Sequence, residues 1–141
     1  MTDVELVDCD VRRLILASGT DFQHIYLGER EGERLFSITI GNSEANEIHR
    51  VLHAGKTARP LTHQLASELL SALGGRLVEV HIVDLKDNTF YARLIVEGPN
   101  GQAQLDARPS DAIALALRRR APIRVAESVL RSADETPGET G

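Results

Sequence analysis

Alternating apolar and polar positions mark two neighbouring segments within residues 23–41. The period of two is that of a half-buried strand. The polar pair Glu31–Gly32 separates the two segments and predicts a turn, so that residues 23–41 form a β-hairpin. The preceding residues 4–17 also predict β-structure. The apolar positions of the hairpin are Ile25, Leu27, Phe36, Ile38 and Ile40.

Helical spacing replaces the alternation after residue 41. Asn42 or Ser43 can accept hydrogen bonds from the free N–H groups of a first turn, and Glu44 suits the positive end of a helix. Apolar residues then recur three or four positions apart, as they do on one face of a helix. These apolar residues are Ala45, Ile48, Val51 and Leu52.

A second helix is predicted between Pro60 and Gly74, because proline suits the first helical position and glycine the residue after the end. Leucines at every fourth position form one apolar stripe, of the kind that a surface helix turns toward the core. His63 and Ser67 lie on the opposite side, so His63 is predicted to be exposed or to line a cleft. The stripe consists of Leu61, Leu65, Leu69 and Leu73.

The second half of the chain predicts three more strands and a helix. Residues 76–85, 89–98 and 101–107 are joined by short turns, which predicts antiparallel neighbours. The last helix starts near Pro109 and is apolar on all sides, as expected for a helix that is buried or sits in an interface. Together these elements predict an α+β fold with a mainly antiparallel sheet and about three helices.

The two halves of the chain resemble each other when the first is shifted by 67 positions. The letters SEA at residues 43–45 then align with SDA at residues 110–112, and each half contains a hairpin, an acidic first turn and a helix. An internal duplication would place Glu44 and Asp111 in equivalent positions, close together across a pseudo-twofold axis. A chance match is the alternative.

Composition and charge restrict the class of protein. The chain has 141 residues, 42% hydrophobic and 26% charged, which suits a single globular domain, predicted as residues 1–131. Residues 132–141 carry three acids and no Lys or Arg, and predict a disordered acidic tail. The net charge of −5 opposes non-specific attraction to nucleic acid. Arginines at positions 118–120 and Arg124 nevertheless leave room for a local basic patch.

The cellular location is predicted from the lack of a membrane span, of a secretion signal and of a cysteine pair in the sequence. No stretch approaches the ~18 apolar residues of a membrane-spanning helix, and the start of the chain lacks the pattern of a secretion signal. The lone Cys9 cannot form an intramolecular disulfide and is predicted to be a small buried apolar residue. These features predict a cytoplasmic protein without membrane contact.

The junction before the last helix has two interpretations. In the first, it only starts a buried helix: Pro109 presets the first turn, and Ser110 and Asp111 favour the exposed N–H groups there. In the second, strand alternation puts Asp106 and Arg108 on the same face. An acid and a base then emerge together beside converging helix N–H groups, where ligands bind in many proteins.

Four stretches of the sequence resemble the bifunctional nuclease domain family of bacteria and plants: FSITIGNSEANEI, RPLTHQL, TFYARL and LDARPSDAIALALRRRAPI. The resemblance runs from about Val11 to Leu130 and implies a compact α+β domain, often oligomeric, that cleaves both RNA and DNA with a divalent metal. In this family the motif histidine is usually followed by an acid, whereas this chain has Gln64. The matching positions are Glu44, Arg59, Pro60, Thr62, His63, Asp87, Phe90, Asp106, Arg108, Pro109, Ser110 and Asp111.

The resemblance leads to a hypothesis in which the protein is a nuclease, a hydrolase with DNase and RNase activity. Carboxylate oxygens can bind Mg²⁺ or Mn²⁺, and the planar guanidinium of arginine can bind phosphate. A histidine can act as general acid or base. Nucleic acid would be bound through its backbone without sequence specificity, because only 4% of residues are aromatic. The assignments are His63, Asp106 and Asp111 to catalysis, Arg59, Arg108 and Ser110 to phosphate, and Asp106, Asp111 and Glu44 to metal.

A different class of function is also open. In this alternative the protein is a non-catalytic binding or regulatory module whose Asp/Arg motif is structural or lies at the interface of a homo-oligomer. The apolar last helix and Gln64 favour it. A small-molecule site at the same junction has no independent support, because the chain has no glycine-rich phosphate loop.

Overall fold

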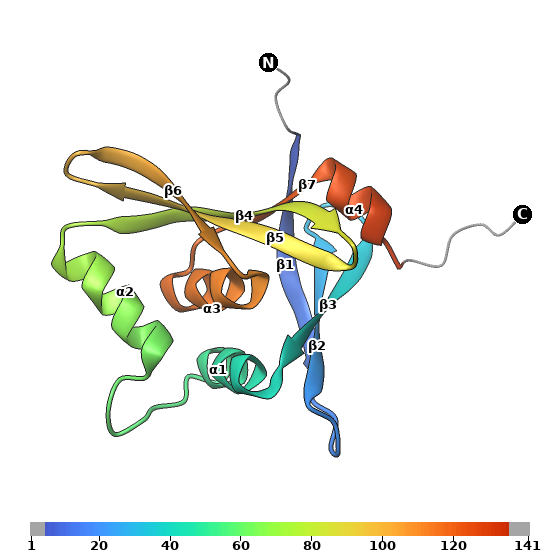
Figure 1. Cartoon of the computed structure of the whole chain (residues 1–141), viewed down its shortest axis with the longest axis horizontal. Helices are drawn as coiled ribbons and strands as arrows, with labels where there is room; N and C mark the ends of the chain where they lie inside the picture. The colour runs from blue at the N-terminus through green and yellow to red at the C-terminus, as the bar shows by residue number, and fades with distance from the viewer. Residues whose placement is uncertain (1–4, 136–141) are drawn as a thin grey trace, which may run out of the picture.

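The computed structural model describes residues 5–135, and Figure 1 shows how their elements are arranged. One mixed sheet and four helices make up this part of the chain. The strands are β1 (Leu6–Ile15), β2 (Phe22–Glu29), β3 (Leu35–Gly41), β4 (Arg76–Lys86), β5 (Thr89–Gly98), β6 (Gly101–Ala107) and β7 (Ile123–Ala126). The helices are α1 (Asn42–Leu52), α2 (Thr62–Ala72), α3 (Pro109–Arg119) and α4 (Glu127–Ala133).

The sheet has the strand order β3-β2-β1-β7-β4-β5-β6. All neighbours are antiparallel except β4 and β7, which are parallel. The predicted α+β class with a mainly antiparallel sheet is therefore confirmed. Two short elements at the end of the chain, β7 and α4, were not predicted. Strand β7 joins the two halves of the sheet because it pairs with β1 on one side and with β4 on the other.

The sheet curls so that its two outer hairpins face each other. Phe36 lies on the edge strand β3 and Phe90 on β5, next to the opposite edge, yet their ring centroids are 5.5 Å apart. Helix α3 lies inside this curl, beneath β4 and β5 and beside α1 and α2 (Figure 1). The prediction that α3 is buried is confirmed, and its buried residues are Ser110, Ala112, Ile113, Ala114 and Ala116.

The halves of the sheet are arranged as the duplication predicts. Strands β1, β2 and β3 run in succession to one edge, and β4, β5 and β6 to the other. Helix α1 spans residues 42–52 and α3 residues 109–119, so one offset of 67 relates both ends. Each helix follows the edge strand of its own half, and the two helices pack together.

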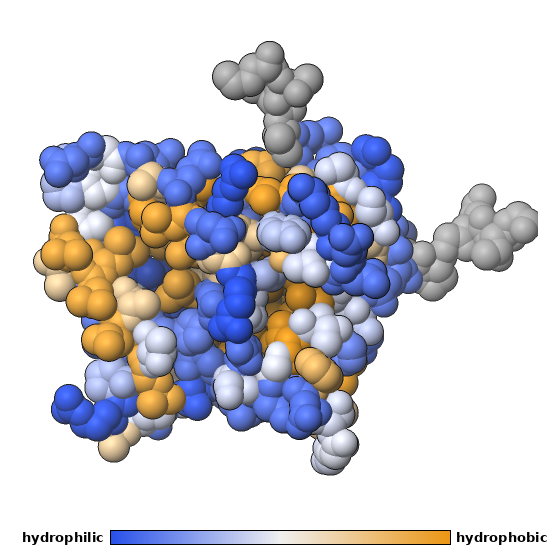
Figure 2. Space-filling view, in the orientation of Figure 1, coloured by the Kyte–Doolittle hydropathy of each residue, from blue (hydrophilic) through white to orange (hydrophobic). Residues whose placement is uncertain are grey.

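The leucine stripe at α2 does not face the core as its pattern predicts, whereas His63 lines a pocket, one of the two positions predicted for it. The four leucines of the stripe point outward, with 42, 51, 54 and 76% of Leu61, Leu65, Leu69 and Leu73 exposed, while Leu70 of α2 packs against the core. A hydrophobic patch lies over α2 in Figure 2. The polar face packs on α3 instead. Ser67 is buried there, and its polar atoms are satisfied because Nη1 of Arg119 donates to its backbone oxygen at 2.8 Å and to its hydroxyl at 2.9 Å. Helix α3 thus supplies polar partners that the sequence pattern of α2 could not reveal.

The predicted boundary of the acidic tail falls inside α4. Residues 132–135 belong to the folded chain: Oδ1 of Asp134 accepts from the backbone N–H of Leu35 at 3.1 Å, and Oε2 of Glu135 accepts from that of Ser37 at 2.8 Å. The rest of the predicted tail lies outside the described residues. Within the described part, no helix is long and apolar enough to cross a membrane.

Candidate functional site

The first turns of three helices meet at one place. Glu44 is the third residue of α1, His63 the second of α2 and Asp111 the third of α3, while Arg108 precedes the first turn of α3. Nε2 of His63 lies 2.7 Å from Oδ1 of Asp111. The His63–Asp111 pair is therefore a contact between two helices whose residues are 48 positions apart in sequence.

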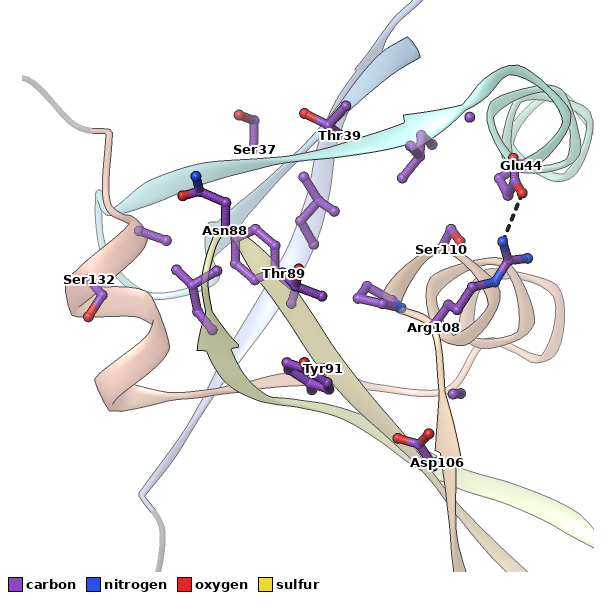
Figure 3. A pocket seen from close by; sticks show the side chains of 18 residues that line it. Ser37, Thr39, Glu44, Asn88, Thr89, Tyr91, Asp106, Arg108, Ser110 and Ser132 are labelled. Atoms are coloured by element: carbon purple, nitrogen blue, oxygen red, sulfur yellow. Dashed lines mark hydrogen bonds and ion pairs between the residues drawn. The ribbon is translucent and has the colours of Figure 1, made fainter. Parts of the chain in front are cut away.

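Arg108 joins the two carboxylates of this group. Its Nε donates to Oδ2 of Asp111 at 2.8 Å and its Nη2 donates to Oδ1 at 3.1 Å, so the two side chains form a bidentate ion pair. Its Nη1 donates to Oε1 of Glu44 at 3.1 Å, the contact drawn in Figure 3. A guanidinium has five N–H donors. Two of them are therefore left for a ligand, and 64% of the Arg108 side chain is exposed to receive one.

The ionisation of the group follows from these contacts. Burial, the largest single influence, raises the pKa of Asp111, but the hydrogen bonds from Arg108 and His63 together outweigh it and leave the pKa below its ordinary value. Asp111 is thus a carboxylate that can only accept, which places the shared proton on Nε2 of His63. In a neutral His63, Nδ1 is then the free acceptor. The hydrogen bond to Asp111 also raises the pKa of Arg108.

Two pockets meet at this group. The helix pocket, of about 660 Å³, lies between α1, α2 and α3, and its lining includes Arg50, His63 and Asp111. The seam pocket, of about 780 Å³, lies between the two ends of the curled sheet and is lined mainly by residues 37–41, 88–91 and 106–110, with part of α4. Glu44 and Arg108 line both pockets. They therefore lie between the two spaces, and Figure 3 shows them in the wall of the seam pocket.

The predicted site residues do not all come together. His63, Asp111, Arg108 and Glu44 form the contacts just described, and the buried Ser110 lines the seam pocket beside Arg108. Asp106 also lines the seam pocket, but it is exposed on β6 in register with Arg93 of β5. Arg59 is exposed in the connection between α1 and α2 and lies outside the linings of both pockets.

The proposed metal ligands do not fit a divalent cation in this arrangement. Both carboxylate oxygens of Asp111 contact Arg108, a fixed cation, and one of them also contacts His63. Within residues 5–135, no group of three or more His, Cys, Asp or Glu side chains could hold a metal ion. The metal site with Asp106, Asp111 and Glu44 as ligands therefore stays a prediction, for which the geometry offers no support.

The helix-start interpretation accounts for only part of the junction. Pro109 is the first residue of α3, as proposed, but no side chain caps the helix. The carboxylate of Asp111 is directed to His63 and Arg108 instead. The predicted cap of α1 is also missing, because Oδ1 of Asn42 accepts from Nε2 of Gln23 at 2.7 Å.

Glu47 of α1 is a buried carboxylate that the sequence pattern did not predict. Glu47 is only 4% exposed, although it is one turn beyond Glu44. Its Oε1 accepts from Nη2 of Arg118 at 2.6 Å and its Oε2 from Nη1 of Arg50. The spacing of three from Glu44 was the available signal, since it puts both acids on one helix face.

The arginine run 118–120 does not form a free basic patch. Arg118 pairs with Glu47, and Arg119 contacts Ser67 and Ser71 on α2. Nε of Arg118 is buried and has no hydrogen-bond partner among the described residues. Two of the three arginines thus hold α3 against α1 and α2.

A different basic segment is exposed. Residues 48–67 contain Arg50, Lys56, Arg59 and three histidines but no Asp or Glu, in a chain of net charge −5. All residues from 52 to 62 are exposed. Within residues 5–135, the side chains of Lys56 and Arg59 have neither an ion pair nor a hydrogen bond. The exposed part of this basic segment leads to His63 at the helix pocket.

Gln64, which replaces the acid usual in the motif, lies away from the described contacts. Its Nε2 donates to Oε1 of Glu68 along α2 at 3.5 Å. It is not among the residues that line either pocket.

The chain is similar in sequence to one known domain family and to two curated proteins. Residues 25–137 match the model of the bifunctional nuclease domain. Two curated proteins of Mycobacterium tuberculosis, from strains CDC 1551 / Oshkosh and H37Rv, are each 46% identical over 109 residues, which is 77% of this chain. Both relatives are described as uncharacterized, and the match spans 65% of their length.

Proposed function

Because the chain belongs to the bifunctional nuclease domain family, we propose that it is a nuclease that cleaves phosphodiester bonds of RNA and DNA at the His63–Asp111 pair. The observation that carries this proposal is the 2.7 Å contact between His63 and Asp111, beside an arginine with unused donors. An acid–histidine pair of this kind can move a proton, and the adjacent guanidinium can bind the phosphate.

In the proposed reaction, the oxygen of a water molecule forms a bond to phosphorus while the bond from phosphorus to the departing oxygen breaks. Nδ1 of His63 takes the proton of the water, and Asp111 holds the ring and stabilises the imidazolium that results. The departing oxygen takes up a proton from solvent. Arg108 donates to a non-bridging phosphate oxygen, where negative charge accumulates in the transition state.

The nucleic acid is proposed to be held through its phosphate backbone. The exposed basic segment supports this, since Lys56 and Arg59 are free to pair with phosphates and lie in the connection that leads to His63. Ser110 can donate a hydroxyl hydrogen from the seam pocket. Such contacts carry no sequence information and depend strongly on salt.

Cleavage of labelled RNA and DNA by the wild type and by His63→Ala tests the proposal, with EDTA, Mg²⁺ or Mn²⁺ in parallel. His81→Ala is the matched control, because His81 is also paired with a carboxylate, that of Glu79, but lies on β4 outside both pockets. Loss of cleavage in the first variant alone supports the proposal. Equal cleavage by all three proteins contradicts it and indicates a contaminating nuclease. The arms with and without metal decide whether a divalent ion is needed.

A non-catalytic binding or regulatory module is the second candidate. It is favoured by one observation: both oxygens of Asp111 are already occupied by Arg108 and His63, as in a network whose role is to hold α2 and α3 together. In that case none of the variants changes cleavage, and His63→Ala lowers only stability or binding.

Association into a homo-oligomer and a cytoplasmic location are also part of the proposal. The exposed leucine stripe of α2 supports the first, because apolar side chains gathered on one helix face are typical of contact surfaces. The buried free thiol of Cys9 fits the second, since it is compatible with a reducing compartment.

A further inference from the structure

The seam pocket is a second binding space beside the proposed catalytic group. It lies where the curl of the sheet brings β3 opposite β5 and β6, and Arg108 forms part of its wall (Figure 3). Its volume of about 780 Å³ is within the range of small-molecule sites. None of the steps assigned to His63 and Asp111 uses it.

The lining of the seam pocket is suited to a neutral polar ligand with an apolar face. Apolar side chains from β3, β5 and the β6–α3 junction form one part of it, and they include Ile38, Ile40 and Phe90. Polar groups form the other part: hydroxyls and an amide, with Thr39, Asn88 and Thr89 among them, and the carboxylates of Glu44 and Asp106. Among the described residues of the lining, Arg108 is the one cation, so a phosphate has a partner of opposite charge only at this wall.

Tyr91 provides a flat surface in this space. The side chain lies on β5, lines the pocket and is 43% exposed, although large aromatic residues are otherwise scarce in this chain. Exposed aromatic rings bind nucleobases by stacking, and this interaction tolerates any base. Tyr91 is therefore suited to hold a base while the phosphate reaches Arg108.

The edge of β3 adds backbone hydrogen-bonding groups. The N–H groups of Leu35 and Ser37 point to the outer edge of this strand, where they donate to Asp134 and Glu135. By strand alternation, the N–H and C=O of Thr39 point to the same edge, which has no neighbouring strand in the described sheet. These groups can pair with the edge of a base or with a sugar hydroxyl.

We propose that the seam pocket binds the nucleoside next to the phosphate held at Arg108, with its base on Tyr91, an inference that rests on the proposed nuclease function. The substrate class follows from this geometry. A base inside a duplex is stacked and paired on its edge, so it must be extruded before it can enter such a pocket. The protein therefore prefers unpaired strands of RNA or DNA to duplexes.

The test compares two substrates that share a leaving group: thymidine 5′-(p-nitrophenyl phosphate) and methyl p-nitrophenyl phosphate. Only the first has a nucleoside. We expect the wild type to have the higher kcat/KM for the nucleoside substrate, and Tyr91→Ala to lose about tenfold of that preference. The methyl substrate has no base to stack, so its kcat/KM, measured for the same protein, is the reference for the preference.

Two further variants make the result specific. Tyr26→Ala removes the other tyrosine, which lies on β2 outside the pocket lining, and should keep the preference. Tyr91→Phe retains the ring and should also keep it. Equal preference in the wild type and in Tyr91→Ala, with both proteins folded by thermal melting, overturns the inference.

A direct binding measurement separates this inference from the proposed function. Calorimetric titration with adenosine 5′-monophosphate and with inorganic phosphate needs no turnover. Tighter binding of the nucleotide than of phosphate, lost in Tyr91→Ala, supports the nucleoside site even if neither ester is hydrolysed. Equal binding of the nucleotide and phosphate contradicts it, whatever the activity.

Discussion

Glu44 and Asp111 occupy equivalent places in the two halves of the fold, and both bind the same residue, Arg108. Each is the third residue of its helix, and each helix follows the edge strand of its half. The two halves differ in what the acid contacts besides Arg108, because only Asp111 has a histidine partner. The proposed proton transfer therefore belongs to the second half, while Glu44 helps to hold Arg108 in place.

Substituting Asp111→Asn should reduce cleavage at least about 100-fold, because the amide cannot stabilise a protonated His63. The midpoint of thermal unfolding should change by no more than about 4 °C, since a partly exposed ion pair contributes about 1 kcal/mol or less. Cleavage of labelled RNA and calorimetric melting measure the two effects. Asp10→Asn is the control, because it breaks an Asp–Arg pair on β1 away from the pockets. A large loss of stability with cleavage retained would assign Asp111 a structural role only.

The same variant should show a pH-dependent loss of stability. The pKa of Asp111 in the folded protein is below its ordinary value of 3.8, so the ionised carboxylate stabilises the fold. This contribution is fully present above about pH 3.8 and is lost as the pH falls through the lower folded pKa. The difference in unfolding free energy between the wild type and Asp111→Asn should therefore shrink at acidic pH. Denaturant titrations between pH 6 and pH 2.5 measure it, and a difference that stays constant speaks against the ion pair.

Removing the buried carboxylate of Glu47 should lower the free energy of unfolding much more than Asp111→Asn does. Glu47→Ala leaves Arg118 without its partner between α1 and α3, a change that destabilises proteins by about 3–5 kcal/mol. Urea unfolding measures the loss. Glu68→Ala, at an exposed position of α2, should change stability by no more than about 0.5 kcal/mol. Similar values for both variants would mean that the Glu47–Arg118 pair is not buried in solution.

Substituting Lys56→Ala and Arg59→Ala together should weaken nucleic-acid binding mainly at low salt. If each side chain neutralises one phosphate of a single strand, the slope of log affinity against log salt becomes less steep by about 1.4. Fluorescence anisotropy of a labelled oligonucleotide at several salt concentrations gives this slope. Arg30→Ala, at an exposed arginine paired with Asp10, is the control and should leave the slope unchanged. An unchanged slope in the double variant would place the phosphate contacts elsewhere.

The leucine stripe of α2 should mediate association of the protein. Leu65→Glu and Leu69→Glu place charges on the exposed face, so they should abolish a homo-oligomer and change the stability of the monomer by only about 0.5 kcal/mol. Sedimentation equilibrium measures the mass in solution. Leu16→Glu changes a leucine that is 48% exposed after β1 and should leave association intact. A monomeric wild type would show that this face does not bind a second copy.

Local patterns predicted much of the secondary structure, because period and turn chemistry are properties of neighbouring residues. The alternation around Ile38 and the spacing around Ile48 identified β3 and α1. The short strand β7 and helix α4 were not predicted, since β7 has only four residues and its formation depends on pairing with β1 and β4. The metal hypothesis placed Asp106 and Asp111 at one ion, and which pocket each side chain lines, the seam pocket for Asp106 and the helix pocket for Asp111, could not be read from local patterns.

The sequence by itself determined the fold class, the family resemblance and the identity of the residues at the junction. It also contained the repeat that relates Glu44 to Asp111. Only the tertiary structure decided which way α2 faces, and thereby that His63 reaches Asp111 while Leu65 stays exposed. The physical reason is that α2 carries two plausible packing faces, and the choice depends on the polar partners that α3 offers from far along the chain.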